Sequence, residues 1–126
     1  MIDDLYQEVI LEEYAHPKNT GKLDSFDVHF AERHASCGDQ IEVFLKFDET
    51  GVSGKVIGVS WIGVGCAISM AAASVLSQEL KGKNRAEIGA LTQQNLENML
   101  GIHGISIGRE KCLLLALTAF QKAITT

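Results

Sequence analysis

The spacing of the apolar residues changes at Gly63 from that of a strand to that of a helix. Before it, apolar and polar residues alternate in Q-I-E-V-F-L-K-F-D (40–48) and in K-V-I-G-V-S-W-I (55–62), which is the period of a half-buried strand. After it, C-A-I-S-M-A-A-A-S-V-L-S-Q-E-L (66–80) is rich in alanine and repeats its apolar residues at helical spacing. We therefore predict an α+β fold, in which a small three-stranded antiparallel sheet packs against several helices.

The remaining elements are predicted from the same two patterns, the alternation typical of a strand and the spacing typical of a helix. In the last strand, alternation places Ile57, Val59 and Trp61 on one face. The first helix should end before His16-Pro17, because a residue that precedes proline is driven out of the α region. The other expected elements are a helix at 2–15, a strand near 27–33, short helical pieces in 84–100, a glycine-rich loop at 101–108 and a last helix from about 109 to 124.

Composition limits the class of protein. The chain has 126 residues, 46% of them hydrophobic and 21% charged, with one proline, so we expect one domain that spans residues 1–126. The net charge is −5, and the Lys/Arg cluster that a nucleic acid or an anionic membrane would need is absent. No apolar run approaches the roughly 18–20 residues of a membrane span, and the start M-I-D-D-L-Y lacks the features of a signal peptide. We expect a cytoplasmic protein.

The chain has three cysteines, Cys37, Cys66 and Cys112, and no C-x-x-C. An odd number of cysteines in a reducing compartment argues against a disulfide framework. Each lies at the boundary of an expected element: Cys37 in a loop that enters a strand, Cys66 at the start of a helix, and Cys112 in the first turn of the last helix. Helix N-termini favour thiolates, and the glycines beside Cys37 and Cys66 leave room for a ligand.

Two interpretations of the cysteines stay open on this evidence. With Asp39, which lies two residues after Cys37, they would form a four-ligand site of three thiolates and one carboxylate, a set that suits zinc or an iron–sulfur cluster. Each cysteine taken alone also fits a small buried core residue. The three cysteines lie too far apart in the sequence to match a local zinc-finger pattern.

Four segments, in order along nearly the whole chain, resemble the U-type iron–sulfur scaffold family, which includes IscU, SufU and the N-terminal domain of NifU. They are H-P-K-N-T-G (16–21), S-C-G-D (36–39), G-V-G-C-A-I-S-M-A-A-A-S (63–74) and R-E-K-C-L-L-L-A (109–116). The resemblance implies an α+β fold of the SufE/IscU type. It also implies that Cys37, Asp39, Cys66 and Cys112 converge to bind the metal or cluster.

The resemblance further implies a function. Scaffolds of this family take sulfur from a cysteine desulfurase of the IscS or SufS type, assemble a [2Fe–2S] cluster from iron and sulfur, and pass it to apo iron–sulfur proteins or downstream carriers. Such a scaffold is mainly non-enzymatic. The candidate sulfur acceptors are Cys37 and Cys112. Asp39, a hard oxygen ligand, would be the exchangeable one that lets the cargo leave.

The last cysteine motif resembles the SufU branch. IscU proteins usually carry His directly before this cysteine and an L-P-P-V-K chaperone-docking motif upstream, whereas this chain has Lys111 and G-I-S-I-G. The resemblance therefore does not imply a dedicated Hsp70-type chaperone. SufU-like proteins commonly hold zinc with the same four side chains and relay persulfide sulfur from the desulfurase. A zinc-binding sulfurtransferase is thus the alternative to a cluster scaffold.

Overall fold

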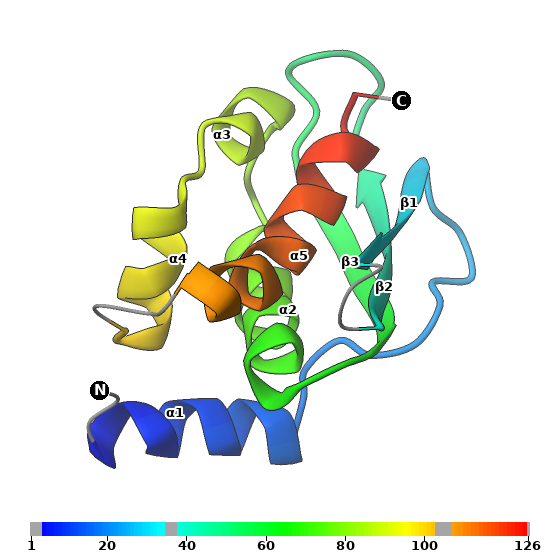
Figure 1. The fold of residues 1–126 in the computed structure, drawn as a ribbon. Helices are drawn as coiled ribbons and strands as arrows, with labels where there is room; N and C mark the ends of the chain where they lie inside the picture. The colour runs from blue at the N-terminus through cyan, green and yellow to red at the C-terminus, as the bar shows by residue number, and fades with distance from the viewer. Residues whose placement is uncertain (1–3, 35–37, 103–106, 126) are drawn as a thin grey trace.

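The computed structural model describes residues 4–34, 38–102 and 107–125. The helices pack on one side of a small sheet, and the order along the chain is one helix, three strands, then four helices (Figure 1). The elements are α1 (Asp4–Ala15), β1 (Val28–His34), β2 (Asp39–Phe47), β3 (Val56–Val64), α2 (Ala67–Glu79), α3 (Arg85–Gly89), α4 (Gln93–Leu100) and α5 (Ile107–Ala123).

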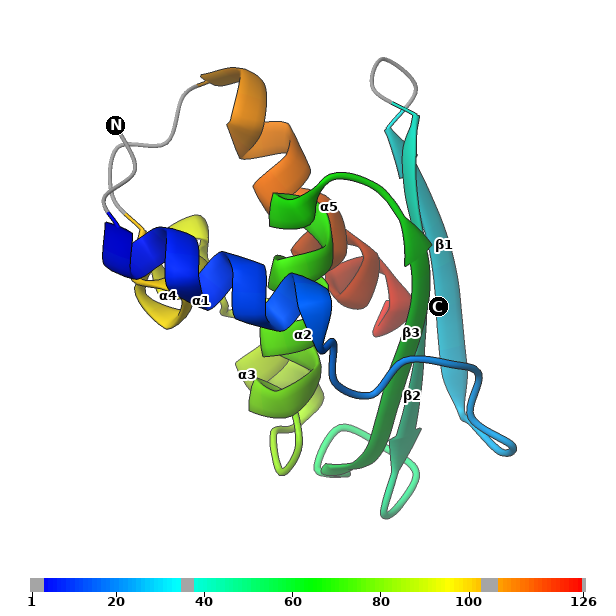
Figure 2. The ribbon, with the colours of Figure 1, turned by 90° about the horizontal axis from the view of Figure 1, so that it is seen from below.

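The three strands form an antiparallel sheet in the order β1-β2-β3, as predicted. The register pairs His34 with Asp39 at one end of β1 and β2, and Gln40 with Val64 across β2 and β3. Helices cover one face of the sheet, and the segment between α1 and β1 crosses its far side (Figure 2). The predicted α+β class, with a three-stranded antiparallel sheet and several helices, is confirmed.

One detail of β3 was predicted wrongly. Val59 and Trp61 are buried, but the side chain of Ile57 is 55% exposed. Phe47 pairs with Val56 and Lys46 pairs with Gly58, so the register shifts at this point and Ile57 is the extra residue of a bulge. The strict alternation on which the prediction depended breaks at such a bulge.

Helix α2 forms the centre of the structure. Nine of its 13 residues are buried, because it packs against the sheet on one side and against α1, α4 and α5 on the others. The run of small residues from Ala71 to Ala73 permits these close approaches. Figure 2 shows α2 and α5 between the sheet and the remaining helices. The helix places Cys66, which precedes its first residue, at the edge of the core.

The segment after α1 forms hydrogen bonds that connect it to α2 and β3. Helix α1 ends at Ala15, as the following His16-Pro17 predicted. The carbonyl of Lys18 accepts a hydrogen bond from Trp61 Nε1 at 2.8 Å and lies 3.2 Å from Ser77 Oγ. Asn19 donates from Nδ2 to Ser77 Oγ at 3.0 Å. The H-P-K-N-T-G segment therefore has a structural role in holding three elements together.

Helices α3 and α4 have well-defined starts. Asn84 and Thr92 each cap a helix, and each forms a capping box with the residue three positions later. Gly101 ends α4 in the left-handed conformation, with φ of 73°. None of the helices within the described residues is both long and apolar enough to span a membrane.

Candidate metal centre

Three of the four predicted ligands come together at one end of the sheet. Asp39 is the first residue of β2, Cys66 precedes α2 and Cys112 lies in α5. One ligand atom from each, a carboxylate oxygen and two sulfurs, lies within 4.8 Å of the others. The sequence separates these residues by 27 and 46 positions, so only the packing of β2, α2 and α5 brings them together.

The fourth predicted ligand, Cys37, lies outside the described residues, and its role stays a prediction. The residue that follows it is described. Gly38 donates its backbone N–H to the carbonyl of His34 at 2.9 Å and has φ of +77°, so the connection between β1 and β2 needs a left-handed residue at this position. A β-carbon at Gly38 would meet nothing within 4 Å, and glycine is favoured here for its backbone conformation.

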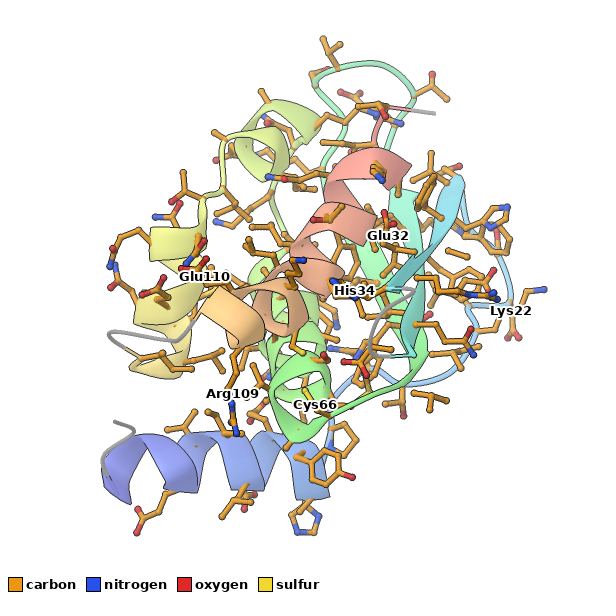
Figure 3. The ribbon with its side chains drawn as sticks, viewed as in Figure 1. Lys22, Glu32, His34, Cys66, Arg109 and Glu110 are labelled. Atoms are coloured by element: carbon orange, nitrogen blue, oxygen red, sulfur yellow. The ribbon has the colours of Figure 1, made fainter. Side chains whose placement is uncertain are left out.

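Cys66 is the N-cap residue of α2. Its backbone is extended, with φ of −71° and ψ of 168°, and its side chain makes no capping hydrogen bond. The side chain is exposed, and Figure 3 shows Cys66 at the end of α2 that faces the loop from β3. Cys66 is therefore accessible to a partner at the start of α2.

Cys112 has a different environment from the one predicted. Helix α5 begins at Ile107, earlier than the expected start near residue 109, so Cys112 lies in its second turn. The helix-dipole effect falls off within the first turn, and the argument for a helix-stabilised thiolate therefore does not apply to Cys112. Cys112 is half-buried and packs against the hydrophobic core. The interpretation of the cysteines as plain core residues fits Cys112 better than Cys66.

Asp39 is a buried carboxylate, with 6% of its surface exposed. Its Oδ2 accepts hydrogen bonds from Ser69 Oγ at 2.6 Å and from the backbone N–H of Cys66 at 3.5 Å. Burial raises its pKa, but the hydrogen bonds from Ser69, from the Cys66 backbone and from the Cys112 and Cys66 thiols outweigh burial and hold the pKa below its ordinary value. Asp39 is therefore ionised and ready to act as a ligand.

Gly65 makes room for this carboxylate. A β-carbon at position 65 would lie 2.8 Å from Cγ and 3.0 Å from Oδ2 of Asp39. Those separations are too short for any side chain larger than hydrogen. The G-V-G-C segment had suggested space for a ligand beside Cys66; at Gly65 the space is taken by Asp39 itself.

Ser69 is a site residue that sequence reasoning missed. Its hydroxyl is buried and contacts Asp39 Oδ2, the carbonyl oxygen of Cys112 at 3.1 Å and the sulfur of Cys66 at 3.5 Å. The available signal was its position three residues after Cys66, which places both side chains on one face of the helix start. A serine in the first turn of a helix is common for other reasons, so this signal was weak.

An apolar groove of about 540 Å³ ends beside the site. Tyr14 and Val64, which are both largely exposed, lie along it, and Gly65 closes it next to Cys66. Exposed apolar side chains that gather in this way mark surfaces for protein contacts. The groove therefore borders the loop that leads to Cys66.

Known proteins resemble this chain along much of its length. The family model of the NifU-like N-terminal domain matches residues 5–126. The iron–sulfur cluster assembly enzyme IscU of Drosophila melanogaster is 29% identical over 123 residues, covering 95% of this chain and 76% of that protein. The zinc-dependent sulfurtransferase SufU of Bacillus subtilis is 39% identical over 85 residues, covering 66% of this chain and 53% of that protein.

The fold has close matches among solved structures. A nitrogen-fixing NifU-like protein (N-terminal) from Brucella abortus superposes with a TM-score of 0.79 at 22% identity, over 98% of this chain and 94% of that one. At this identity the match concerns the fold alone. The arrangement of the sheet and helices around Asp39, Cys66 and Cys112 is therefore that of an established fold.

Proposed function

The chain belongs to the family of NifU-like N-terminal domains, and from this premise we propose that it is an iron–sulfur cluster assembly scaffold. It receives sulfur from a cysteine desulfurase, binds iron and builds a [2Fe–2S] cluster, which it passes to apo-proteins or downstream carriers. The observation that carries the proposal is the approach of Asp39, Cys66 and Cys112 to within 4.8 Å of one another. Residues 1–126 act as one unit in this proposal, and the family match over 5–126 supports that.

The donor atoms suit the cargo. Thiolates are the usual ligands of iron–sulfur clusters and of zinc, and a carboxylate completes such a set. Two sulfurs bound to one tetrahedral metal ion at about 2.3 Å lie about 3.8 Å apart, so the sulfurs of Cys66 and Cys112, which lie within 4.8 Å of each other, need to approach by about 1 Å at most to share one ion. Cys37 is proposed as the fourth ligand. The ionised state of Asp39 supports the fit, because it needs no proton loss on binding.

The chemistry of sulfur acceptance follows from the thiols. A thiolate of the scaffold attacks the outer sulfur of the desulfurase persulfide; a new S–S bond forms, the donor's S–S bond breaks, and the donor cysteine leaves as a thiolate. Cys37 and Cys112 are the proposed acceptors. The exposed end of the site at Cys66 and the adjoining apolar groove support an approach of the donor from that side.

A zinc-binding sulfurtransferase is the second candidate, and a specific observation favours it. Of the two relatives described above, the zinc-dependent sulfurtransferase SufU has the higher identity to this chain over the matched residues. Lys111 also precedes Cys112, as in the SufU branch. Three thiolates and one carboxylate complete a closed tetrahedral zinc site. In this proposal Cys37, Asp39, Cys66 and Cys112 would hold zinc, which would order the site, and Cys37 would accept sulfur from the desulfurase and pass it on.

Metal analysis and an anaerobic visible spectrum of the purified protein separate the two candidates. The scaffold predicts sulfur-to-iron charge-transfer bands after anaerobic reconstitution with desulfurase, cysteine and ferrous iron. These bands should be lost in Cys66→Ser and retained in Ser77→Ala, which alters a buried serine far from the ligands. A folded wild-type protein without these bands would exclude the scaffold.

The sulfurtransferase predicts a different outcome from the same preparations. About one tightly bound zinc per chain, together with strong stimulation of a desulfurase and no stable cluster, would support it. Cys37→Ala tests the relay directly. Full stimulation by this variant would show that Cys37 is not the residue that accepts sulfur.

A further inference from the structure

Ser69 lies at the point where the three described ligands meet. It is 1% exposed and belongs to the first turn of α2, while its hydrogen-bond partners come from β2 and α5. Its Oγ is 2.6 Å from Asp39 Oδ2 and 3.1 Å from the carbonyl oxygen of Cys112. It also lies 3.5 Å from the sulfur of Cys66. One hydroxyl therefore touches all three residues.

The hydroxyl has one proton and cannot donate to two acceptors at once. The 2.6 Å contact with a carboxylate is in the range of a charge-assisted O–H···O⁻ bond, which is stronger than a bond to a neutral carbonyl. The carbonyl of Cys112 also lies within α5, where the backbone four residues later is its regular partner. We conclude that the Ser69 proton belongs mainly to Asp39.

The other buried serines of α2 have different partners. Ser74 donates to Glu13 Oε1 at 2.8 Å, and Ser77 donates to the carbonyl of Ser74 at 2.7 Å. Both serve the contact between α1, the segment at 16–21 and α2. Among the described residues of this helix, Ser69 is the serine whose hydroxyl is turned toward the ligands.

We propose that Ser69 is a positioning residue, which orients the Asp39 carboxylate as a metal ligand. The hydroxyl of Ser69 and the backbone N–H of Cys66 both bind Oδ2, and Gly65 packs against the same oxygen. Asp39 is thereby fixed through one oxygen, and Oδ1 is left to bind the metal. This inference rests on the proposed function of the site, and it assigns to Ser69 a role that acts through Asp39.

A double-mutant cycle on metal affinity tests the proposal without cluster assembly or sulfur transfer. Zinc affinity is measured by competition with a chromophoric chelator for the wild type, Ser69→Ala, Asp39→Ala and the double variant. We expect Ser69→Ala to weaken binding about 10- to 100-fold in the wild-type background and less than about twofold in the Asp39→Ala background. A tenfold difference between backgrounds corresponds to about 1.4 kcal/mol of coupling. Equal effects in both backgrounds would overturn the proposal.

The visible spectrum of the bound metal is a second measurement, and a general loss of protein stability would not change its bands. With cobalt(II) as the probe, Ser69→Ala should change the ligand-field bands, because the carboxylate loses its fixed orientation. Ser77→Ala is the matched control: it removes a buried hydroxyl from the same helix and should leave the cobalt spectrum and zinc affinity unchanged. Unchanged bands in Ser69→Ala would count against a positioning role.

Ser69→Thr keeps the hydroxyl and should restore at least part of the affinity, provided that its thermal unfolding shows a folded protein. The same unfolding check applies to Ser69→Ala, because this variant removes a hydrogen bond from the buried Asp39 carboxylate. If the folded wild type binds neither zinc nor cobalt, the proposed function and this inference fail together. If the wild type binds both metals and the cycle shows no coupling, the role of Ser69 alone is refuted.

Discussion

Gly65 and Asp39 pack so closely that a β-carbon on residue 65 would lie 2.8 Å from the carboxyl carbon of Asp39. The two residues come from different elements, the loop before α2 and the start of β2. Because residue 65 has no side chain, the backbone beside Cys66 can lie close to the carboxylate. The hydrogen bond from the Cys66 N–H to Asp39 depends on this close approach. The glycine before Cys66 is therefore part of the metal centre, although it supplies no ligand.

Gly65→Ala should weaken metal binding while the protein stays folded. The added methyl group forces Asp39 to move by several tenths of an ångström or more, so we expect zinc affinity to fall about tenfold or more, measured by chelator competition. Gly89→Ala is the matched control, because a β-carbon there meets only Ile124 Cδ1, at 3.8 Å. An unchanged affinity in Gly65→Ala would show that the position of Asp39 is unimportant for binding.

Asp39→Cys should slow the release of a bound cluster. A fourth thiolate is a softer and firmer ligand for iron than a carboxylate oxygen, so transfer to an apo-ferredoxin, followed by circular dichroism in the visible range, should slow by about tenfold or more. Gln40→Cys adds a thiol at the next residue of β2, on the exposed side of the strand, and should transfer at the wild-type rate. Equal transfer rates for Asp39→Cys and the wild type would contradict the role of Asp39 as the exchangeable ligand.

The secondary structure could be predicted from the sequence because it depends on local pattern. The alternation at 40–48 and the alanine-rich run at 66–80 each correspond to a described element, β2 and α2. Ile57 was misplaced because a bulge is set by pairing with another strand, a contact that overrides the local pattern. The described part of α5 begins at Ile107, close to the expected start near residue 109.

The candidate site could be predicted only in part. Family resemblance named Asp39, Cys66 and Cys112 as ligands, and the structure places them together, whereas residue spacing alone left the core interpretation open. Ser69 had only the weak signal of lying three residues after Cys66, since its partners Asp39 and Cys112 lie 30 and 43 residues away. The function of a hydroxyl depends on what it faces, and no local pattern encodes that.

Trp61→Phe should destabilise the protein by about 1–3 kcal/mol. The indole Nε1 donates to the carbonyl of Lys18 at 2.8 Å, and Trp61 is buried, so phenylalanine loses this hydrogen bond and leaves a small cavity. Urea unfolding followed by far-ultraviolet circular dichroism measures the free energy of unfolding. Ile57→Val, at an exposed position on the same strand, should change it by less than about 0.5 kcal/mol. Similar values for the two variants would show that the segment at 16–21 is not anchored through Trp61.

The depressed pKa of Asp39 predicts how the stability of the metal-free protein depends on pH. Burial raises this pKa, but the hydrogen bonds from Ser69, Cys66 and Cys112 outweigh it, so the folded-state pKa lies below the ordinary value of 3.8. A carboxyl group with a lowered folded-state pKa stabilises the protein above its unfolded-state pKa, and this contribution is lost as the pH falls through the folded-state value.

Asp39→Asn removes that contribution and provides the measurement. In urea unfolding with a chelator and a reductant present, the wild type should be the more stable protein at about pH 7, and the difference in the free energy of unfolding should shrink below about pH 4. Asp24→Asn removes one negative charge from an exposed position and reports the effect of net charge alone. A difference between the wild type and Asp39→Asn that stayed constant from about pH 7 to about pH 3 would mean that the Asp39 carboxylate gains nothing from its hydrogen bonds in the folded state.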